Sequence, residues 1–272
     1  MKYLLILVSA LIFTKAYTQE LFVFTEPASN MAANTIGIRT NNYLMKDIDT
    51  KKLNYHLVPE IMLGVSKKIM IHLDAFLSNR NGGFITEGGS IYGKYRFYSM
   101  DEVHKHFRMA AYARYSFNNS DIHQTAIDLY GHNSGFETGI IATQLINKVA
   151  ISAGVAALHA TDNGKEKFNY GTKNRNAVNY TFSAGKLMLP KEYNSYKQAN
   201  VNLMLEFLGQ TNLKTAQNFL DVAPSVQFIF NSRLRVDAGY RYPLITNLTR
   251  TAPQGVVLKL EYNFFNVIKQ KD

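Results

Sequence analysis

The sequence predicts an all-β protein: a transmembrane, antiparallel, up-and-down β-barrel of about 12 strands, forming a single domain after a signal peptide. Three observations support this prediction. The N-terminus has the pattern of an export signal, apolar and polar residues alternate in segments of about ten residues, and short connections alternate with longer ones.

The first 18 residues follow the order of a secretory signal peptide. A positive start precedes the apolar run of residues 3–13, and Ala16 and Thr18 stand at the small-residue positions before a cleavage at Gln19. The run is shorter than the about 20 residues that a spanning helix needs. We therefore expect export and a mature chain from Gln19; a retained N-terminal anchor is the alternative.

The alternation is clearest in the last predicted strand. One face is apolar and the other mostly polar: Val256, Leu258, Leu260, Tyr262 and Phe264 against Val257, Lys259, Glu261 and Asn263. In chain order, the eleven strands predicted before it run over 36–41, 56–66, 69–78, 91–98, 107–116, 136–146, 149–155, 178–184, 200–207, 221–230 and 234–241. The phase of 136–146 is ambiguous. Twelve is an even number, as a single-chain bacterial barrel requires.

The predicted connections fall into two sets. Those in the shorter set, read as periplasmic turns, are 67–68, 99–105, 147–148, 190–197 and 231–232. Those in the longer set, read as outer loops, are 45–52, 79–86, 118–134, 161–175, 209–217 and 243–253. This sorting is the rule for outer-membrane barrels, and a soluble sandwich gives no reason for it. Because a sheet in lipid cannot leave its edges unpaired, the strands must close, with the apolar face toward lipid and the charged face toward the lumen.

The chain divides into a signal peptide (1–18), an N-terminal segment (19–35), the barrel (36–266) and a short tail (267–272). Residues 20–34 do not alternate well, and they either plug the lumen or simply lead into the first strand. We place the protein in the outer membrane of a Gram-negative bacterium. Its expected partners are outer-membrane lipid, a small solute that is anionic or organic, and the barrel-assembly machinery, which would contact the last strand.

Composition excludes several functions. The chain has no cysteine, so it has no thiol metal site and no cysteine nucleophile. Its 30 Lys and Arg against 20 Asp and Glu give a net charge of +10, which suits a surface beside anionic lipid headgroups. Nucleic acid fits poorly with an exported chain. No phosphate-binding glycine loop is present, and we expect no cofactor and no enzymatic activity.

Two groups of charges face the predicted lumen. With a loop centred near Leu248, Arg235 lies opposite Glu261 and Asp237 opposite Lys259, which predicts a ladder of opposite charges. This ladder either only fills the barrel or forms part of a solute path.

The second group is basic throughout and comes from two neighbouring strands: Lys94, Arg96, Arg108 and Arg114. Like charges across a strand pair are unfavourable unless they are neutralised. Luminal acids such as Glu60 and Asp74, or an anionic solute, would do this. The second alternative is a hypothesis of anion preference.

A family resemblance rests on three segments: 21–30 (LFVFTEPASN), 93–97 (GKYRF) and 261–265 (EYNFF). With the signal peptide, they resemble poorly characterised outer-membrane barrels similar to the transporter-like family of the meta-pathway of phenol degradation. The resemblance covers most of the mature chain and implies a substrate-uptake barrel, with small organic solutes as its substrates. Its motifs are structural, so it assigns no functional residue.

The sequence gives only weak signals for a metal site or for a hydrolase site. His56 and His72 both face the lumen but lie too far apart along the strands to share a metal, and His104 and His106 form only a pair beside a turn. Residues 132–135 (HNSG) resemble the His-x-Ser piece of the outer-membrane phospholipase A family. In that reading His132 is a base for Ser134, and Asn163 is the candidate third group.

The preferred function is therefore a channel or transporter-like barrel that passes small solutes by diffusion through a charged lumen. A structural or adhesion barrel without transport is the alternative, and a lipid hydrolase comes third.

Overall fold

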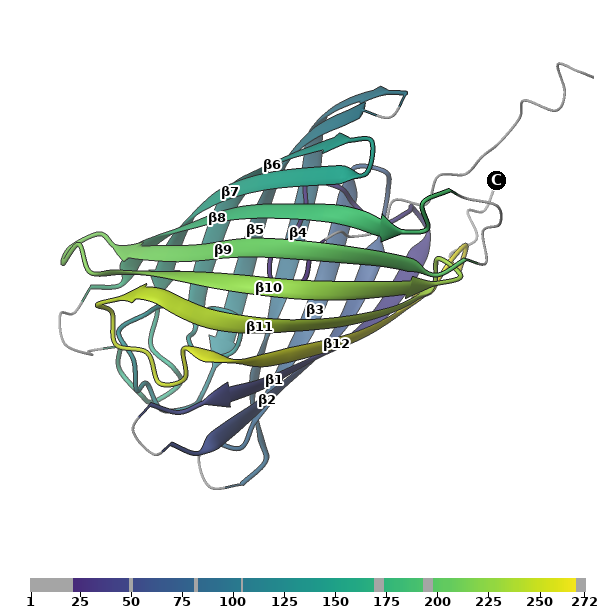
Figure 1. The fold of residues 1–272 in the computed structure, drawn as a ribbon. Coiled ribbons are helices and arrows are strands. Elements are labelled where there is room, and N and C mark those ends of the chain that lie inside the picture. Colours follow the sequence, from purple (N-terminus) through teal and green to yellow (C-terminus); the bar gives the residue numbers. More distant parts are fainter. Residues whose placement is uncertain are drawn as a thin grey trace, which may run out of the picture.

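The computed structural model describes residues 22–48, 51–80, 83–103, 105–168, 174–192 and 198–267, so the predicted signal peptide lies outside the described residues. The described chain forms twelve antiparallel strands that close into one barrel (Figure 1), which confirms the predicted fold. The strands are β1 (Thr35–Lys46), β2 (Leu53–Gly64), β3 (Ile69–Ser78), β4 (Ile85–Glu102), β5 (Lys105–Asn118), β6 (Gly135–Ile146), β7 (Val149–Ala160), β8 (Asn176–Leu189), β9 (Asn200–Asn212), β10 (Asn218–Phe230), β11 (Leu234–Thr246) and β12 (Gln254–Phe264). Each strand pairs with its neighbours in sequence, and β1 pairs with β12. In the described ranges, no helix is long and apolar enough to cross a membrane.

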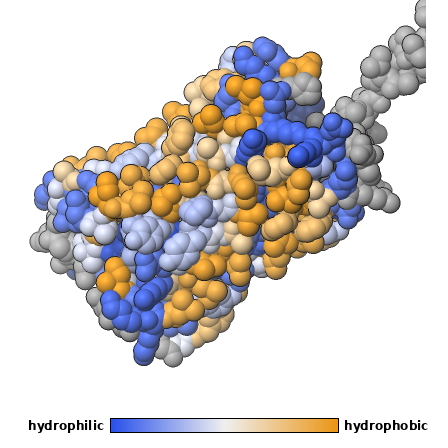
Figure 2. Space-filling model, in the orientation of Figure 1, coloured by the Kyte–Doolittle hydropathy of each residue, from blue (hydrophilic) through white to orange (hydrophobic). Residues whose placement is uncertain are grey.

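The outer wall of the barrel is apolar and the interior is polar. Along β7, exposed and buried residues alternate almost without interruption. Apolar residues (orange) cover much of the barrel wall, and hydrophilic residues (blue) gather toward its ends (Figure 2). Charged residues such as Glu206 and Asp237 are fully buried inside. An apolar outer belt around a closed sheet is the arrangement that lipid requires. The predicted assignment of the two faces is therefore confirmed.

The structure resolves the ambiguous phase of 136–146. Phe136 and Ile140 are exposed on the outside, whereas Ile141 and Thr143 are buried inside the barrel. Sequence alone left this open because apolar residues occupy both faces: the luminal Ile141 packs against Ala28, a residue of the N-terminal segment.

Some strands run further than predicted. β4 continues to Glu102 and β5 begins at Lys105, so most of the predicted 99–105 turn is paired strand. Likewise β9 continues to Asn212, three residues past the start of the predicted loop at 209. Backbone pairing persists in these stretches, although polar residues stand on both faces and the alternation fades. The predicted sorting of connections by length is correspondingly weaker: residues 190–199 form a longer connection than residues 213–217.

Two of the described stretches outside the strands fill part of the lumen. The first is the N-terminal segment (residues 22–34), in which Phe22, Val23 and Ala28 are at most 2% exposed. The second is the inward loop (residues 119–134), in which Ile127 and Leu129 are each 2% exposed. The N-terminal segment therefore both leads into β1 and fills part of the lumen.

Candidate solute chamber in the lumen

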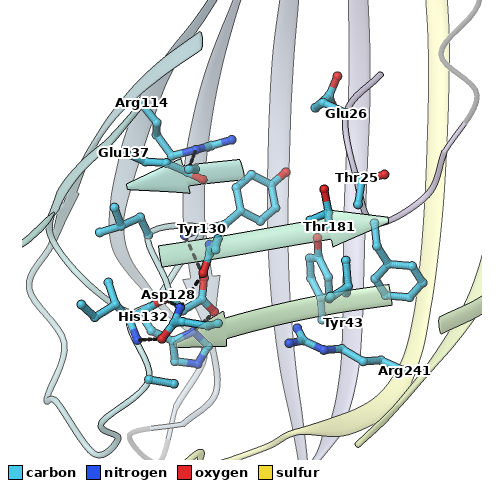
Figure 3. A pocket seen from close by; sticks show the side chains of 18 of the residues that line it. Thr25, Glu26, Tyr43, Arg114, Asp128, Tyr130, His132, Glu137, Thr181 and Arg241 are labelled. Atoms are coloured by element: carbon cyan, nitrogen blue, oxygen red, sulfur yellow. Dashed lines mark hydrogen bonds and ion pairs between the residues drawn. The ribbon is translucent and has the colours of Figure 1, made fainter. Parts of the chain in front are cut away.

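A cavity of about 330 Å³ lies inside the barrel between the N-terminal segment and the inward loop (Figure 3). We call this cavity the chamber. The N-terminal segment, the inward loop, the barrel wall and other loops line it. The lining residues that carry polar groups include Thr25, Glu26, Asp128, Tyr130, His132, Arg114, Glu137 and Arg241. Its volume is at the lower end of the range for small-molecule sites.

A single buried carboxylate holds the start of the N-terminal segment. Glu206, on β9, accepts hydrogen bonds from the backbone N–H groups of Val23, Phe24 and Thr25 at 2.9, 3.0 and 2.8 Å. The Thr25 hydroxyl donates to the same carboxylate at 2.8 Å and contacts the Ser183 hydroxyl. An ionised carboxylate offers only acceptors, so it satisfies several backbone donors that the lumen would otherwise leave unpaired.

A second anchor of the segment uses one of the predicted luminal cations. The Lys94 ammonium, 1% exposed, donates to the Pro27 carbonyl at 2.8 Å and lies 3.4 Å from the Glu26 carboxylate. Arg39 lies 3.4 Å from the other oxygen of Glu26. The Ala28 N–H donates to the Thr143 hydroxyl at 2.9 Å. Lys94 therefore binds the N-terminal segment. The sequence did not predict this contact.

Of the other three cations of that predicted group, Arg114 lies apart, whereas Arg96 and Arg108 are near one another on the paired strands β4 and β5. Arg114 pairs with Asp74 at 2.9 Å and with Glu137 at 3.5 Å, whereas Arg108 pairs with Asp101 at 2.9 Å. Arg96 has no carboxylate within ion-pair distance in the described part of the chain. Residues 108 and 114 of one strand are about 20 Å apart at the usual strand rise.

Acids of the protein therefore neutralise Arg114 and Arg108. Asp74 has its predicted partner, whereas Glu60 binds Arg39 at 3.3 Å and His72 at 2.5 Å instead of the basic group. The role of these cations in a solute path stays a prediction.

The predicted ladder on β11 and β12 has the expected register, with Arg235 opposite Glu261 and Asp237 opposite Lys259. The ion pair of Arg235 with Glu261 follows the register, but Asp237 pairs with Arg235 and not with Lys259. Arg235 contacts both acids, Glu261 at 3.0 Å and Asp237 at 3.1 Å. Among the described residues, no carboxylate comes within ion-pair distance of Lys259, which lines the chamber. The register could be predicted from the alternation. That Asp237 pairs with Arg235 instead of Lys259 depends on how far the side chains reach.

Sequence reasoning missed two arginines at the chamber. Arg241 on β11 and Arg250 in the β11–β12 loop both line it, and both donate to Asp221, at 2.6 and 2.5 Å. Arg241 is the last residue of the predicted strand 234–241, and the sequence pattern gives it no role. No pattern in the sequence singles out Arg250, because it lies in a segment that is predicted only as a loop.

The predicted His132–Ser134 arrangement is not formed. The Ser134 hydroxyl donates to the Asn118 carbonyl at 3.0 Å and accepts from the Asn118 N–H at 2.8 Å. Asn163 bonds the backbone of Ser134 and His132 rather than an imidazole, and the His132 ring contacts Asp128 at 2.9 Å. These residues precede β6, so the rule that alternate strand residues share a face does not apply to them.

The luminal histidines have local partners. The His56 ring stacks on Tyr43 with ring centroids 5.7 Å apart, and His72 contacts Glu60. In the described ranges, no group of three or more His, Asp or Glu side chains is arranged to hold a metal ion. His104 lies outside the described residues, so the predicted His104–His106 pair cannot be placed.

No protein-family model matches this chain, and no curated protein matches it. Among solved structures, an outer-membrane channel from Pseudomonas putida F1 is similar over 89% of this chain and 99% of its own, with 12% identity and a TM-score of 0.55. The β domain of the Bordetella autotransporter BrkA covers 85% of this chain and 98% of its own, with 11% identity and a TM-score of 0.44. Acinetobacter baumannii OccAB4 covers 82% and 56%, with 9% identity and a TM-score of 0.40.

At these identities the likeness shows the fold, which is that of the outer-membrane barrels. A closed antiparallel barrel with an apolar outer belt lies in the outer membrane of a Gram-negative bacterium. The finer resemblance to the transporter-like family of the meta-pathway of phenol degradation stays a prediction.

Proposed function

We propose that this protein is a passive outer-membrane channel for small solutes, closed at rest by its N-terminal segment. The observation that carries the proposal is the position of the chamber. It lies inside the barrel, where a terminal segment and loops complete the lining that the strands begin. A solute on its way through the barrel would pass through this chamber.

The N-terminal segment is the better candidate for the moving part. It joins the barrel wall at Thr35 only, whereas the inward loop is joined to β5 at one end and to β6 at the other. Its polar contacts with the wall include those to Glu206 and Lys94, beside apolar contacts that involve small side chains such as Ala28. Water can replace each of these polar contacts when the segment leaves, because Glu206 and the backbone N–H groups would then both be hydrated.

In this mechanism, charge and shape select the solute. Release of the segment joins the chamber to the periplasmic end, and the solute then diffuses past the charged side chains of the wall. No energy source is needed. A narrow lumen agrees with the strand number, because twelve strands lie between the small filled barrels and the wide porins.

Single-channel conductance in a planar bilayer tests the proposal. The refolded mature chain, residues 19–272, is compared with a form lacking residues 20–34 and with Glu206→Ala. We expect rare or small steps from the mature chain, and larger or more frequent steps from the other two. Glu166→Ala is the matched control, because Glu166 is exposed in an outer loop. Folding of each form is checked by its resistance to unfolding in cold detergent.

Silence of all the folded forms would overturn the proposal. It would favour the alternative, a structural or adhesion barrel that presents its loops without transport.

A further inference from the structure

We propose that Arg241 and Arg250 form a subsite of the chamber that binds the carboxylate of a small organic monoanion. The subsite lies at the end of the chamber nearest the outer loops, because Arg250 belongs to the β11–β12 loop. The inference names a substrate class for the chamber, and as a step in transport it rests on the proposed channel function. The binding itself can be tested separately.

The two guanidinium groups share one counter-charge. Arg241 Nε and Arg250 Nη1 both donate to the same oxygen of Asp221, at 2.6 and 2.5 Å. Asp221 is fully buried in the wall and is not among the residues that line the chamber. An incoming solute would therefore meet the two cations and not the acid. The three side chains together carry a formal charge of +1, which one negative charge on a solute neutralises.

Arg250 has donors that no group in the described ranges uses. The residue is 7% exposed, and its Nε and Nη2 atoms are buried without a hydrogen-bond partner. A buried donor left unpaired is costly, most of all on a charged group, so such atoms call for a partner. Burial also lowers the pKa of Arg250, against the opposing effect of Asp221, as expected for a charge that is short of counter-charge.

The chain holds Arg250 in place from two sides. Its guanidinium carbon lies 4.0 Å from the ring centroid of Phe219, a cation–π distance that fixes the plane of the group. The backbone on either side of it is tied to the inward loop: the Thr249 N–H donates to the Thr125 hydroxyl at 2.9 Å, and the Thr251 N–H donates to Gln124 at 3.3 Å. The cation is therefore held in position before a ligand arrives.

The rest of the chamber lining favours an anion that also carries an apolar organic group. Tyr43, Ile127, Leu129 and Leu208 contribute apolar surface to its lining. A planar carboxylate matches the fork of an arginine, and its single charge matches the net charge of the three side chains better than the double charge of phosphate does. The site therefore suits a small molecule with one carboxylate and a short apolar part.

Calorimetric titration of the refolded mature protein in a zwitterionic detergent tests the subsite. Sodium butyrate is the probe, and butyramide is its neutral counterpart of nearly equal shape. Both stay in water rather than in the micelle. We expect butyrate to bind at least about 10-fold more tightly than butyramide, and Arg250→Gln to weaken butyrate by about 10-fold or more. Arg175→Gln is the control of equal charge change, because Arg175 pairs with Asp162 outside the chamber.

The titration is repeated on Glu206→Ala, which opens the chamber if the segment blocks entry, and with Arg241→Gln in case Arg250→Gln does not fold. Equal binding of butyrate and butyramide in both the closed and the opened protein would overturn the subsite. Binding that Arg250→Gln and Arg241→Gln leave unchanged would also overturn it. Butyrate binding by a barrel that never conducts would keep the subsite and reject the channel, and conduction without butyrate binding would do the reverse.

Discussion

The two parts of the chain that enter the lumen are held in different ways. Charged groups hold the backbone of the N-terminal segment, beside its apolar packing: Glu206 accepts its backbone N–H bonds, and Lys94 binds the Pro27 carbonyl. The centre of the inward loop is bound by a neutral amide, because Gln210 donates to the Ile127 carbonyl at 2.7 Å and accepts from its N–H at 2.8 Å; nearer its end, Arg80 donates to the Gly131 carbonyl. Apolar packing around Ile127 and Leu129 adds to this.

This difference bears on which part moves. Apolar packing and a neutral amide pair are nearly independent of pH, and both would be lost at once if the loop left the wall. Contacts to charged groups can be exchanged for water and changed by protonation. We therefore expect the segment to open while the loop stays fixed.

The largest effect should come from Glu206→Ala. Three backbone N–H groups lose their acceptor at the same time, so the amides of Val23, Phe24 and Thr25 should exchange hydrogen at least about 10-fold faster, with the channel open more often. Hydrogen exchange followed by mass spectrometry measures this.

Gln210→Ala is the companion variant on the other side of the comparison. It removes the amide pair to Ile127, and we expect it to speed exchange in the inward loop while leaving residues 22–25 as they were. If instead Gln210→Ala freed the N-terminal segment, or Glu206→Ala did not, the two parts would not be independent.

A covalent lock should abolish opening, and the sequence offers a clean background because it has no cysteine. Ala28 of the segment and Ala110 of β5 are each fully buried in one apolar cluster with Ile141. The double variant Ala28→Cys with Ala110→Cys should conduct less when oxidised and recover on reduction. Ala110→Cys alone is the control, and its conductance should not respond to oxidation. Unchanged conductance of a fully cross-linked double variant would mean that the path does not need the segment to move.

The barrel could be predicted well from the sequence because every second residue of a strand in lipid faces the lipid and is therefore apolar. The alternation in β12 and the register of Arg235 with Glu261 both follow from that constraint. The chamber could not be predicted in the same way. Arg250 and Tyr130 reach it from loops, and no periodicity connects a loop residue with the wall that it contacts. Glu206 falls within the predicted strand 200–207, but its partners are backbone N–H groups, and no side chain in the sequence indicates such a contact.

A smaller effect should come from acid. Burial alone would raise the pKa of Glu26, but Lys94, His72 and Arg39 outweigh it and hold the pKa at about 2, below its ordinary value of 4.5. A depressed pKa means that Glu26 stabilises the docked segment fully above about pH 4.5, and that this contribution is lost as the pH falls toward 2. Glu60 is the neighbouring acid that works against this shift.

Conductance recorded between pH 6 and pH 3 tests this dependence. Opening should increase below about pH 4.5, and Glu26→Gln should open more readily at pH 6 and respond less to acid. A response of equal size in Glu26→Gln would assign the acid effect to another group.

The smallest effect should come from charges outside the lumen. Asp101 lies near the end of the β4–β5 hairpin, which extends beyond the rest of the barrel wall (Figure 1), and its side chain is 46% exposed. It pairs with Arg108 at 2.9 Å and His106 at 2.8 Å, but exposed pairs contribute little. Asp101→Asn should change the free energy of unfolding by less than about 1 kcal/mol and leave conductance unchanged. If Asp101→Asn altered conductance as strongly as Glu206→Ala, charge far from the segment would control opening, and the buried contacts of Glu206 would no longer explain why the segment is the part that moves.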